Sequence, residues 1–106
     1  MFQKDHEEAC KILFGRPMDG PNKWIDACYP DFLYNGTKAH YGSVHYHWIE
    51  RHHLQAITAQ YGETSLEAQA CKLHVMMDWL SHFGVIEMPK NSEEVKQLLD
   101  MHLGVR

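Results

Sequence analysis

The stretch from residue 64 to residue 84, TSLEAQACKLHVMMDWLSHFG, decides the fold class of this chain. Thr64 and Glu67 have the spacing of a helix N-terminal capping box, and Gly84 is of the residue type that commonly follows a last helical turn. Between them the sequence holds neither proline nor glycine, and apolar residues recur nearly all round a helical projection. The segment therefore predicts a mostly buried helix that runs to about Phe83.

Helix start and stop signals also flank this segment on both sides. Residues 37–61 form a long stretch without proline that ends before Gly62, and they predict a second long helix. No segment shows the sustained period-two alternation of a half-buried strand. The predicted helices cover residues 6–14, 22–28 with Asn22 as the cap, 37–61 or only the part after Gly42, and 64–83. A last one starts after Asn91 or Ser92 and closes before Gly104. We therefore expect one all-α domain over residues 1–106, a bundle of four to five helices whose two longest members pack antiparallel.

Composition and charge exclude several classes of protein. The chain has 106 residues, of which 44% are hydrophobic and 23% charged, as in an ordinary globular domain. Ten Lys and Arg against fourteen Asp and Glu give a net charge of -4, and no basic run is present, so nucleic-acid binding is not expected. Neither a secretory signal nor an apolar run long enough for a membrane span is apparent, which predicts a cytoplasmic protein without membrane contact.

Familiar nucleophile and phosphate motifs are absent as well. The three cysteines, Cys10, Cys28 and Cys71, are an odd number without a C-x-x-C pair, which argues against a disulfide framework and a zinc ribbon. The sequence contains no Gly-rich phosphate loop and no nucleophile elbow. What remains distinctive is the histidine content, nine residues in all.

One stripe of the 64–83 helix gathers side chains that bind metals. At about 100° per residue, its members fall within about 80° of one another, and neighbours three or four apart can touch. Imidazole, thiolate and carboxylate are zinc ligands, and imidazole with carboxylate also suits Fe or Mn. The same stripe has a structural interpretation, as the one solvent-exposed face of an otherwise apolar helix. Its members are Glu67, Cys71, His74, Asp78 and His82.

The 37–61 segment would bring further histidines to that stripe. Glu50 and His53 have the E-x-x-H spacing of carboxylate-bridged di-iron bundles, although the second such motif is missing. Our hypothesis is one Zn, Fe or Mn ion bound between the two long helices. The predicted ligands are His52, His53, His74 and Asp78, with His47, Glu50, Cys71 and His82 as alternates. In a catalytic version, an open position would bind water for hydrolysis and Glu50 or Glu67 would act as base.

The pattern His47-x4-His52-His53-x3-Ile57-x3-Tyr61-Gly62 resembles a functionally uncharacterised family of short His-rich bacterial and phage proteins. His74-Val75 with Asp78, and the segment 86–94, are similar to later parts of that family's pattern. The resemblance covers about 40 residues, and Trp48 and Ala56 depart from it. It implies no activity, but it groups His47, His52, His53 and His74 as one unit.

Two other functions are compatible with the sequence, and whether the chain is an enzyme stays open. One is a non-catalytic interaction protein, such as a phage or bacterial accessory factor that binds a host protein, or a homodimer; it requires aromatic and His side chains on an exposed patch. The other is a proton-sensitive switch in which buried His45 and His52 become charged below about pH 6. In the structural interpretation these two are hydrogen-bonded core residues. His102 is then expected to pack, and His6 to face solvent.

Overall fold

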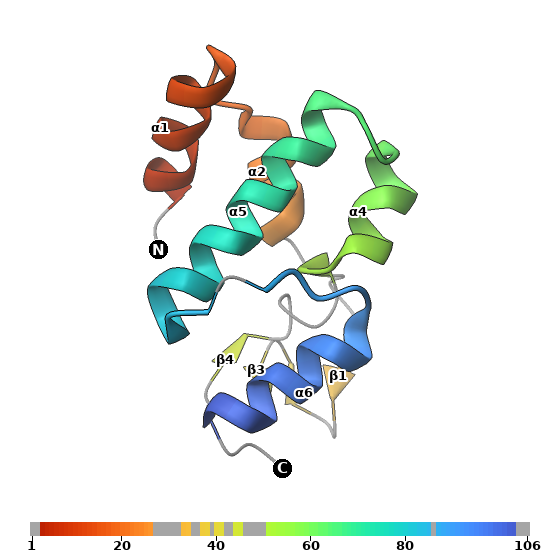
Figure 1. Ribbon diagram of the computed structural model, residues 1–106. Coiled ribbons are helices and arrows are strands. Elements are labelled where there is room, and N and C mark those ends of the chain that lie inside the picture. Colours follow the sequence, from red (N-terminus) through yellow and green to blue (C-terminus); the bar gives the residue numbers. More distant parts are fainter. Residues whose placement is uncertain are drawn as a thin grey trace.

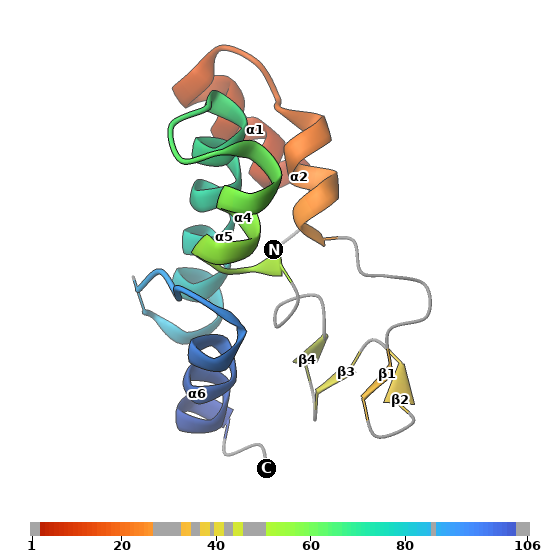
Figure 2. The same ribbon diagram turned by 90° about the vertical axis from the view of Figure 1, so that its right-hand side faces the viewer.

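The computed structural model describes residues 3–26, 33–34, 37–38, 40–41, 44–45, 51–85 and 87–103. Five helices lie in this part of the chain (Figure 1), and they confirm the predicted helical fold class. Figures 1 and 2 show α5 at the centre, with α1, α2 and α4 around it and α6 below them. The helices are α1 (Gln3–Phe14), α2 (Asp19–Asp26), α4 (Leu54–Tyr61), α5 (Leu66–Phe83) and α6 (Ser92–Leu103).

Helix α5 forms where the sequence predicts it, with the N-terminal cap shifted by one residue. The Ser65 hydroxyl, rather than that of Thr64, accepts the backbone N–H of Ala68 at 3.0 Å. At the other end Gly84 adopts a left-handed conformation, with φ 69°, and its N–H donates to the carbonyl of Leu80. These caps satisfy groups that a helix end leaves without intrahelical partners.

The prediction of a helix over residues 37–61 is wrong for residues 37–38, 40–41 and 44–45, which are strands. Arg51 and α4 are helical as predicted, and residues 46–50 lie outside the described residues. Helix α4 packs against α5 in the opposite direction. Residues 33–45 contain four strands of two residues each: β1 (Leu33–Tyr34) pairs antiparallel with β2 (Thr37–Lys38), and β3 (His40–Tyr41) with β4 (Val44–His45). β-Branched and aromatic residues, together with Gly36 and Gly42, favour hairpins over a helix here.

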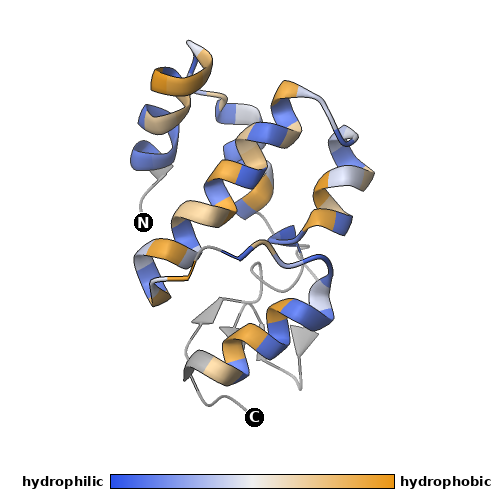
Figure 3. Ribbon diagram, in the orientation of Figure 1, coloured by the Kyte–Doolittle hydropathy of each residue, from blue (hydrophilic) through white to orange (hydrophobic). Residues whose placement is uncertain are grey.

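The core is made by the helices. One cluster joins α2, α4, α5 and α6, and a smaller one joins α1 to α5 and to Met18 before α2. Hydrophobic and hydrophilic segments alternate along the helices, as expected where each helix buries one side (Figure 3). None of the described helices combines the length and apolarity that crossing a membrane requires. The buried members of the larger cluster are Ile25, Ile57, Ala68, Cys71, Val75, Trp79, Val95, Leu98 and Leu99.

The start of α4 is held by a segment far along the chain. The backbone N–H groups of Leu54 and Gln55 donate to the carbonyls of Pro89 and Lys90, each at 2.9 Å. The His53 ring caps the same turn, since its Nδ1 accepts the N–H of Ala56 at 3.2 Å. First-turn N–H groups have no partner within their own helix. The loop between α5 and α6 therefore fixes where α4 begins, next to His52.

Candidate metal centre

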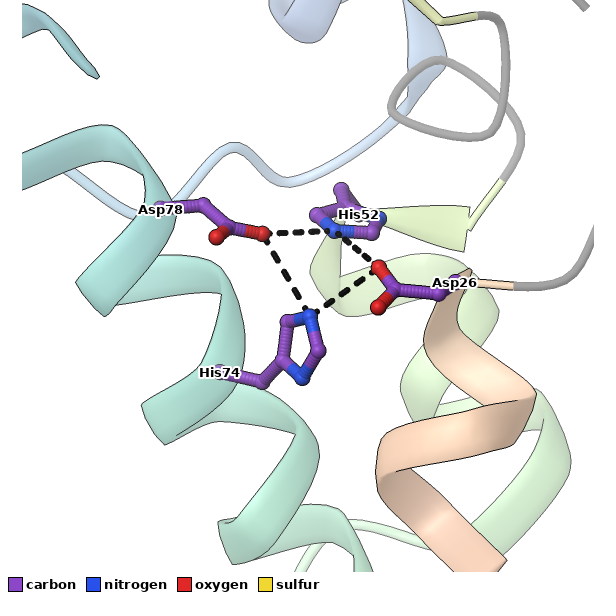
Figure 4. Close-up of side chains that lie close together, drawn as sticks. All are labelled: Asp26, His52, His74 and Asp78. Carbon is purple, nitrogen blue, oxygen red and sulfur yellow. Dashed lines mark hydrogen bonds and ion pairs between the residues drawn. The ribbon is translucent and has the colours of Figure 1, made fainter. Parts of the chain in front are cut away.

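Four side chains from three separate segments converge on one point (Figure 4). Asp26 is the last residue of α2, His52 lies two residues before α4, and His74 and Asp78 lie one turn apart on α5. One ligand atom from each lies within 4.8 Å of all the others. Three of the four residues are buried, while the Asp26 side chain is 37% exposed and forms the solvent side of the group.

The four atoms alternate between nitrogen and oxygen around the cluster. Asp78 Oδ2 lies 3.1 Å from His52 Nε2 and 3.4 Å from His74 Nε2. Asp26 Oδ1 lies 3.6 Å from His52 Nε2 and 3.0 Å from His74 Nε2. Ligand bonds of about 2.0–2.1 Å in a tetrahedral zinc site imply ligand–ligand separations of about 3.3 Å. The four nitrogen–oxygen distances scatter around that value, and all six separations lie within 4.8 Å.

The predicted stripe on α5 is only partly the site. His74 and Asp78 face inward and are buried, so the interpretation of this stripe as a solvent-exposed face is wrong for them. His82 is exposed and outside the group, and Glu67 is about 10 Å along the helix from His74, too distant to serve as its base. The Cys71 thiol is buried and lies 3.7 Å from the carbonyl of Pro21 instead.

Asn22 fixes the orientation of the His74 ring. The Asn22 amide group donates to the carbonyls of Pro17 and Met18 at 3.0 and 2.9 Å and contacts the Cys10 thiol at 3.4 Å. Its Oδ1 therefore faces His74 and accepts from Nδ1 at 2.8 Å. With the proton on Nδ1, Nε2 is left to face the two carboxylates, where it serves as a ligand or, when it is protonated, as a donor. The sequence suggested Asn22 as a helix cap, but it lies inside α2, fully buried.

His6 is a further member of the cluster. It was predicted to face solvent, but it is 1% exposed because α1 packs against both α2 and α5. Its Nε2 lies 3.0 Å from Asp78 Oδ1, the oxygen on the other side of the carboxylate from His52 and His74. The His6 ring also stacks on the His74 ring, with centroids 3.4 Å apart and planes 10° apart.

The charges of the cluster follow from burial and from these contacts. Burial alone would raise the pKa of Asp78, but hydrogen bonds from His52, His6 and His74 outweigh it and hold the pKa below its usual range. Burial lowers the pKa of His52 despite its bond to Asp78. For His74, burial is outweighed by Asp26 and Asp78, so its pKa is raised. Asp78 is thus an anion that accepts from all three rings, and His52 is held in the neutral form that binds metals.

The structure brings together three of the four predicted ligands, His52, His74 and Asp78, and His53 lies outside their group, with its Nδ1 directed at the first turn of α4. Asp26 is the fourth member of the group. The sequence analysis missed it, because a helix over residues 22–28 gave no reason to expect Asp26 near the other two segments. Of the alternates, His47 and Glu50 lie outside the described residues, as does the side chain of His45.

Arg51 joins two of the segments that carry ligands. Its Nη1 donates to the carbonyl of Trp24 at 2.8 Å, and its guanidinium carbon lies 4.8 Å from the centre of the Trp24 ring. Arg51 directly precedes His52, and Trp24 lies two residues before Asp26. The contact therefore holds the end of α2 against the segment that presents His52.

Comparison of the chain with protein-family models, with curated proteins and with solved structures found no significant match. Two imidazoles and two carboxylates in one partly open group can bind a divalent metal ion with borderline or hard ligand preference.

Proposed function

We propose that this protein binds one divalent transition-metal ion, Zn²⁺ or alternatively Fe²⁺ or Mn²⁺, through His52, His74, Asp78 and Asp26. The observation that carries the proposal is the alternating arrangement of two imidazole nitrogens and two carboxylate oxygens, with neighbouring atoms 3.0–3.6 Å apart. Two carboxylates balance the charge of such an ion. Without the ion, the negative charges of these buried or half-buried carboxylates are compensated only by the protons on the His52 and His74 rings and on other neighbouring groups.

The donor set favours a reactive metal ion over a structural one. Structural zinc sites are mostly closed and rich in cysteine, whereas catalytic sites use His and carboxylate ligands and keep a position for water. Among the described residues no thiolate belongs to the group, and the Asp26 side chain is partly exposed. A divalent ion in such a site activates water, so hydrolysis is the reaction class that we assign.

The inward direction of the histidines also bears on the alternative function. An interaction protein was expected to display its His side chains on an exposed patch. His6, His52 and His74 are instead buried and meet around one carboxylate. This convergence supports a metal site over a docking surface.

The first experiment is elemental analysis of protein purified without a His tag or a metal column. We expect about one equivalent of Zn, Fe or Mn. Thermal unfolding with and without EDTA gives a second measurement, because a ligand at 100 times its Kd stabilises the folded state by about 2.7 kcal/mol. Protein without metal, together with a melt that neither EDTA nor added Zn²⁺, Fe²⁺ or Mn²⁺ changes, would contradict the proposal.

Matched variants locate the site within the chain. His74→Ala and Asp26→Asn should abolish stoichiometric binding. His82→Ala removes an exposed His from the same helix as His74 and should leave binding intact. His53→Ser keeps an N-terminal cap on α4, since Ser is a favoured capping residue. Normal binding by His53→Ser and loss in Asp26→Asn would identify Asp26 as the fourth ligand; the reverse result would restore His53.

Hydrolysis is tested separately with chromogenic esters and phosphate esters. Activity should follow the metal content of the protein and disappear in His74→Ala. Metal binding without any such activity would leave the metal site standing and overturn the reaction class for these substrates.

A further inference from the structure

His6 contacts two members of the proposed metal site without belonging to its ligand group. It lies on α1, whereas the four ligands come from α2, from α5 and from the residues before α4. A carboxylate oxygen accepts and a ring N–H donates, so the His6 Nε2–H is the donor in their 3.0 Å contact. His6 thus touches Asp78 from the side away from the other rings.

Because of this contact, the two carboxylate oxygens of Asp78 have different partners. Oδ1 of Asp78 accepts from His6, while Oδ2 faces the Nε2 atoms of His52 and His74. A carboxylate is planar, so holding one oxygen fixes the position of the other. With Oδ1 engaged, Asp78 has a single oxygen to offer to an ion in the group.

The same ring supports a second ligand by stacking. His6 covers one face of the His74 ring at 3.4 Å, and His52 meets that ring nearly edge-on, with planes at 81°. The hydrogen bond to Asn22 fixes the remaining rotation. One buried residue therefore limits the movement of both ligands that α5 provides.

We propose that His6 is a positioning residue of the metal site, which keeps Asp78 a one-oxygen ligand and holds the His74 ring in place. The proposal rests on the metal site proposed above. Partners that hydrogen-bond to metal ligands typically change metal affinity by about 10–100-fold when they are removed. Their loss also changes the coordination of the ion, because a released carboxylate can bind through both oxygens.

Three variants at His6 change the presence and the reach of its N–H donor separately from its ring. His6→Gln keeps an N–H donor at a reach comparable to that of Nε2. His6→Asn carries the same amide on a side chain one methylene shorter, too short to reach Asp78 from α1. His6→Phe keeps a ring that can stack but donates nothing. His82→Ala is the control for loss of a His outside the site.

The test is titration of the metal-free variants with Co²⁺, followed by the visible absorption spectrum. A four-coordinate Co²⁺ ion absorbs more strongly than one with five or six ligands. We expect His6→Asn and His6→Phe to bind Co²⁺ about 10–100-fold more weakly and with lower molar absorption, and His6→Gln to recover most of both. A variant is compared only when its helical circular dichroism spectrum matches that of wild type. One folded variant of the two, His6→Asn or His6→Phe, is enough for the test.

The outcomes separate this proposal from the one on which it rests. If wild-type protein binds Co²⁺ and His6→Asn or His6→Phe binds it with the same affinity and spectrum, the role of His6 is overturned and the metal site stands. Weaker binding that His6→Gln does not recover would also overturn it, because a purely structural role of the ring predicts that result. Wild-type protein that binds no Co²⁺ would overturn both proposals together.

Discussion

Asn22 and His74, 52 positions apart in the sequence, share a buried hydrogen bond in which His74 Nδ1 donates to Asn22 Oδ1 at 2.8 Å. The Asn22 amide group in turn donates to two backbone carbonyls between α1 and α2. A fully buried amide thus links the α1–α2 connection to a proposed metal ligand on α5. Its contacts predict consequences for both stability and binding.

We expect Asn22→Ala to lower the free energy of unfolding of the metal-free protein by about 2–4 kcal/mol. The buried donor on His74 and the Pro17 carbonyl lose this partner, while the Met18 carbonyl keeps the backbone N–H of residue 22. Urea unfolding in EDTA measures this change. Lys23→Ala, at the exposed neighbouring position of α2, serves as the control and should differ from wild type by about 0.5 kcal/mol or less. Equal stability of the two variants would contradict the assigned hydrogen bonds.

The pKa values of His52 and His74, the two proposed histidine ligands, should depart in opposite directions from the ordinary value of about 6.5. In metal-free protein the pKa of His74 is raised by Asp26 and Asp78, and that of His52 is lowered by burial. NMR spectra of the imidazole protons between pH 5 and 8 should therefore show His52 titrating at lower pH than His74. The reverse order would refute the charge assignment of the cluster.

These shifts also determine how each ring affects stability. The raised pKa of His74 makes its contribution complete below about pH 6.5, and the contribution is lost as the pH rises through the folded-state value. The lowered pKa of His52 acts in the other direction, since the unfolded chain takes up its proton first as the pH falls below about 6.5. His52→Gln should therefore lose less stability than wild type between pH 6.5 and 5, as followed by urea unfolding in EDTA.

Arg51 is expected to affect metal binding although it is not a ligand. Arg51→Ala removes the bond to the Trp24 carbonyl and the contact with its ring, so the segments of Asp26 and His52 are less firmly joined. We predict a loss of about 1–3 kcal/mol in unfolding free energy and weaker Zn²⁺ binding by calorimetry. Arg51→Lys should recover little, because an ammonium lacks the planar fork. If Arg51→Lys recovers wild-type stability and Zn²⁺ binding, a positive charge at position 51 is sufficient and the guanidinium contacts are not needed.

Cys71 should be unreactive in the folded protein. Burial, followed by the nearby Cys10 and Glu67, raises the pKa of its thiol to about 12, and the thiolate is the reactive form. Peptide mapping after iodoacetamide treatment at pH 8 should find Cys71 unlabelled in native protein and labelled in urea. Rapid native labelling would place this thiol outside the core.

The sequence predicts those parts of the structure that depend on local signals. The caps and apolar residues of 64–84 lie within a few residues of the helix they define, so α5 and the shared face of His74 and Asp78 could be predicted. The length and lack of proline of the segment 37–61 favoured a helix, but its β-branched and aromatic residues and Gly42 favour strands at its start. Of its described residues, 37–38, 40–41 and 44–45 are strands, and Arg51 and 54–61 are helical.

The remaining parts of the site depend on contacts between distant segments. His6 was assigned to solvent because α1 alone does not show which neighbours cover it. Asp26 becomes a candidate ligand only once α2 packs against α5. His52 and His53 are adjacent and both buried, and the turn before α4 decides that His52 faces the cluster while His53 caps the helix.

The backbone bonds that hold the start of α4 make the site depend on residues that never touch it. All four proposed ligands, and His6 as well, precede Gly84, but the carbonyls that anchor Leu54 and Gln55 belong to Pro89 and Lys90. A fragment ending at Gly84 would carry every ligand while leaving two amide groups beside His52 unsatisfied. The geometry of the proposed site is therefore set in part by the α5–α6 loop, which contributes two backbone carbonyls and no ligand.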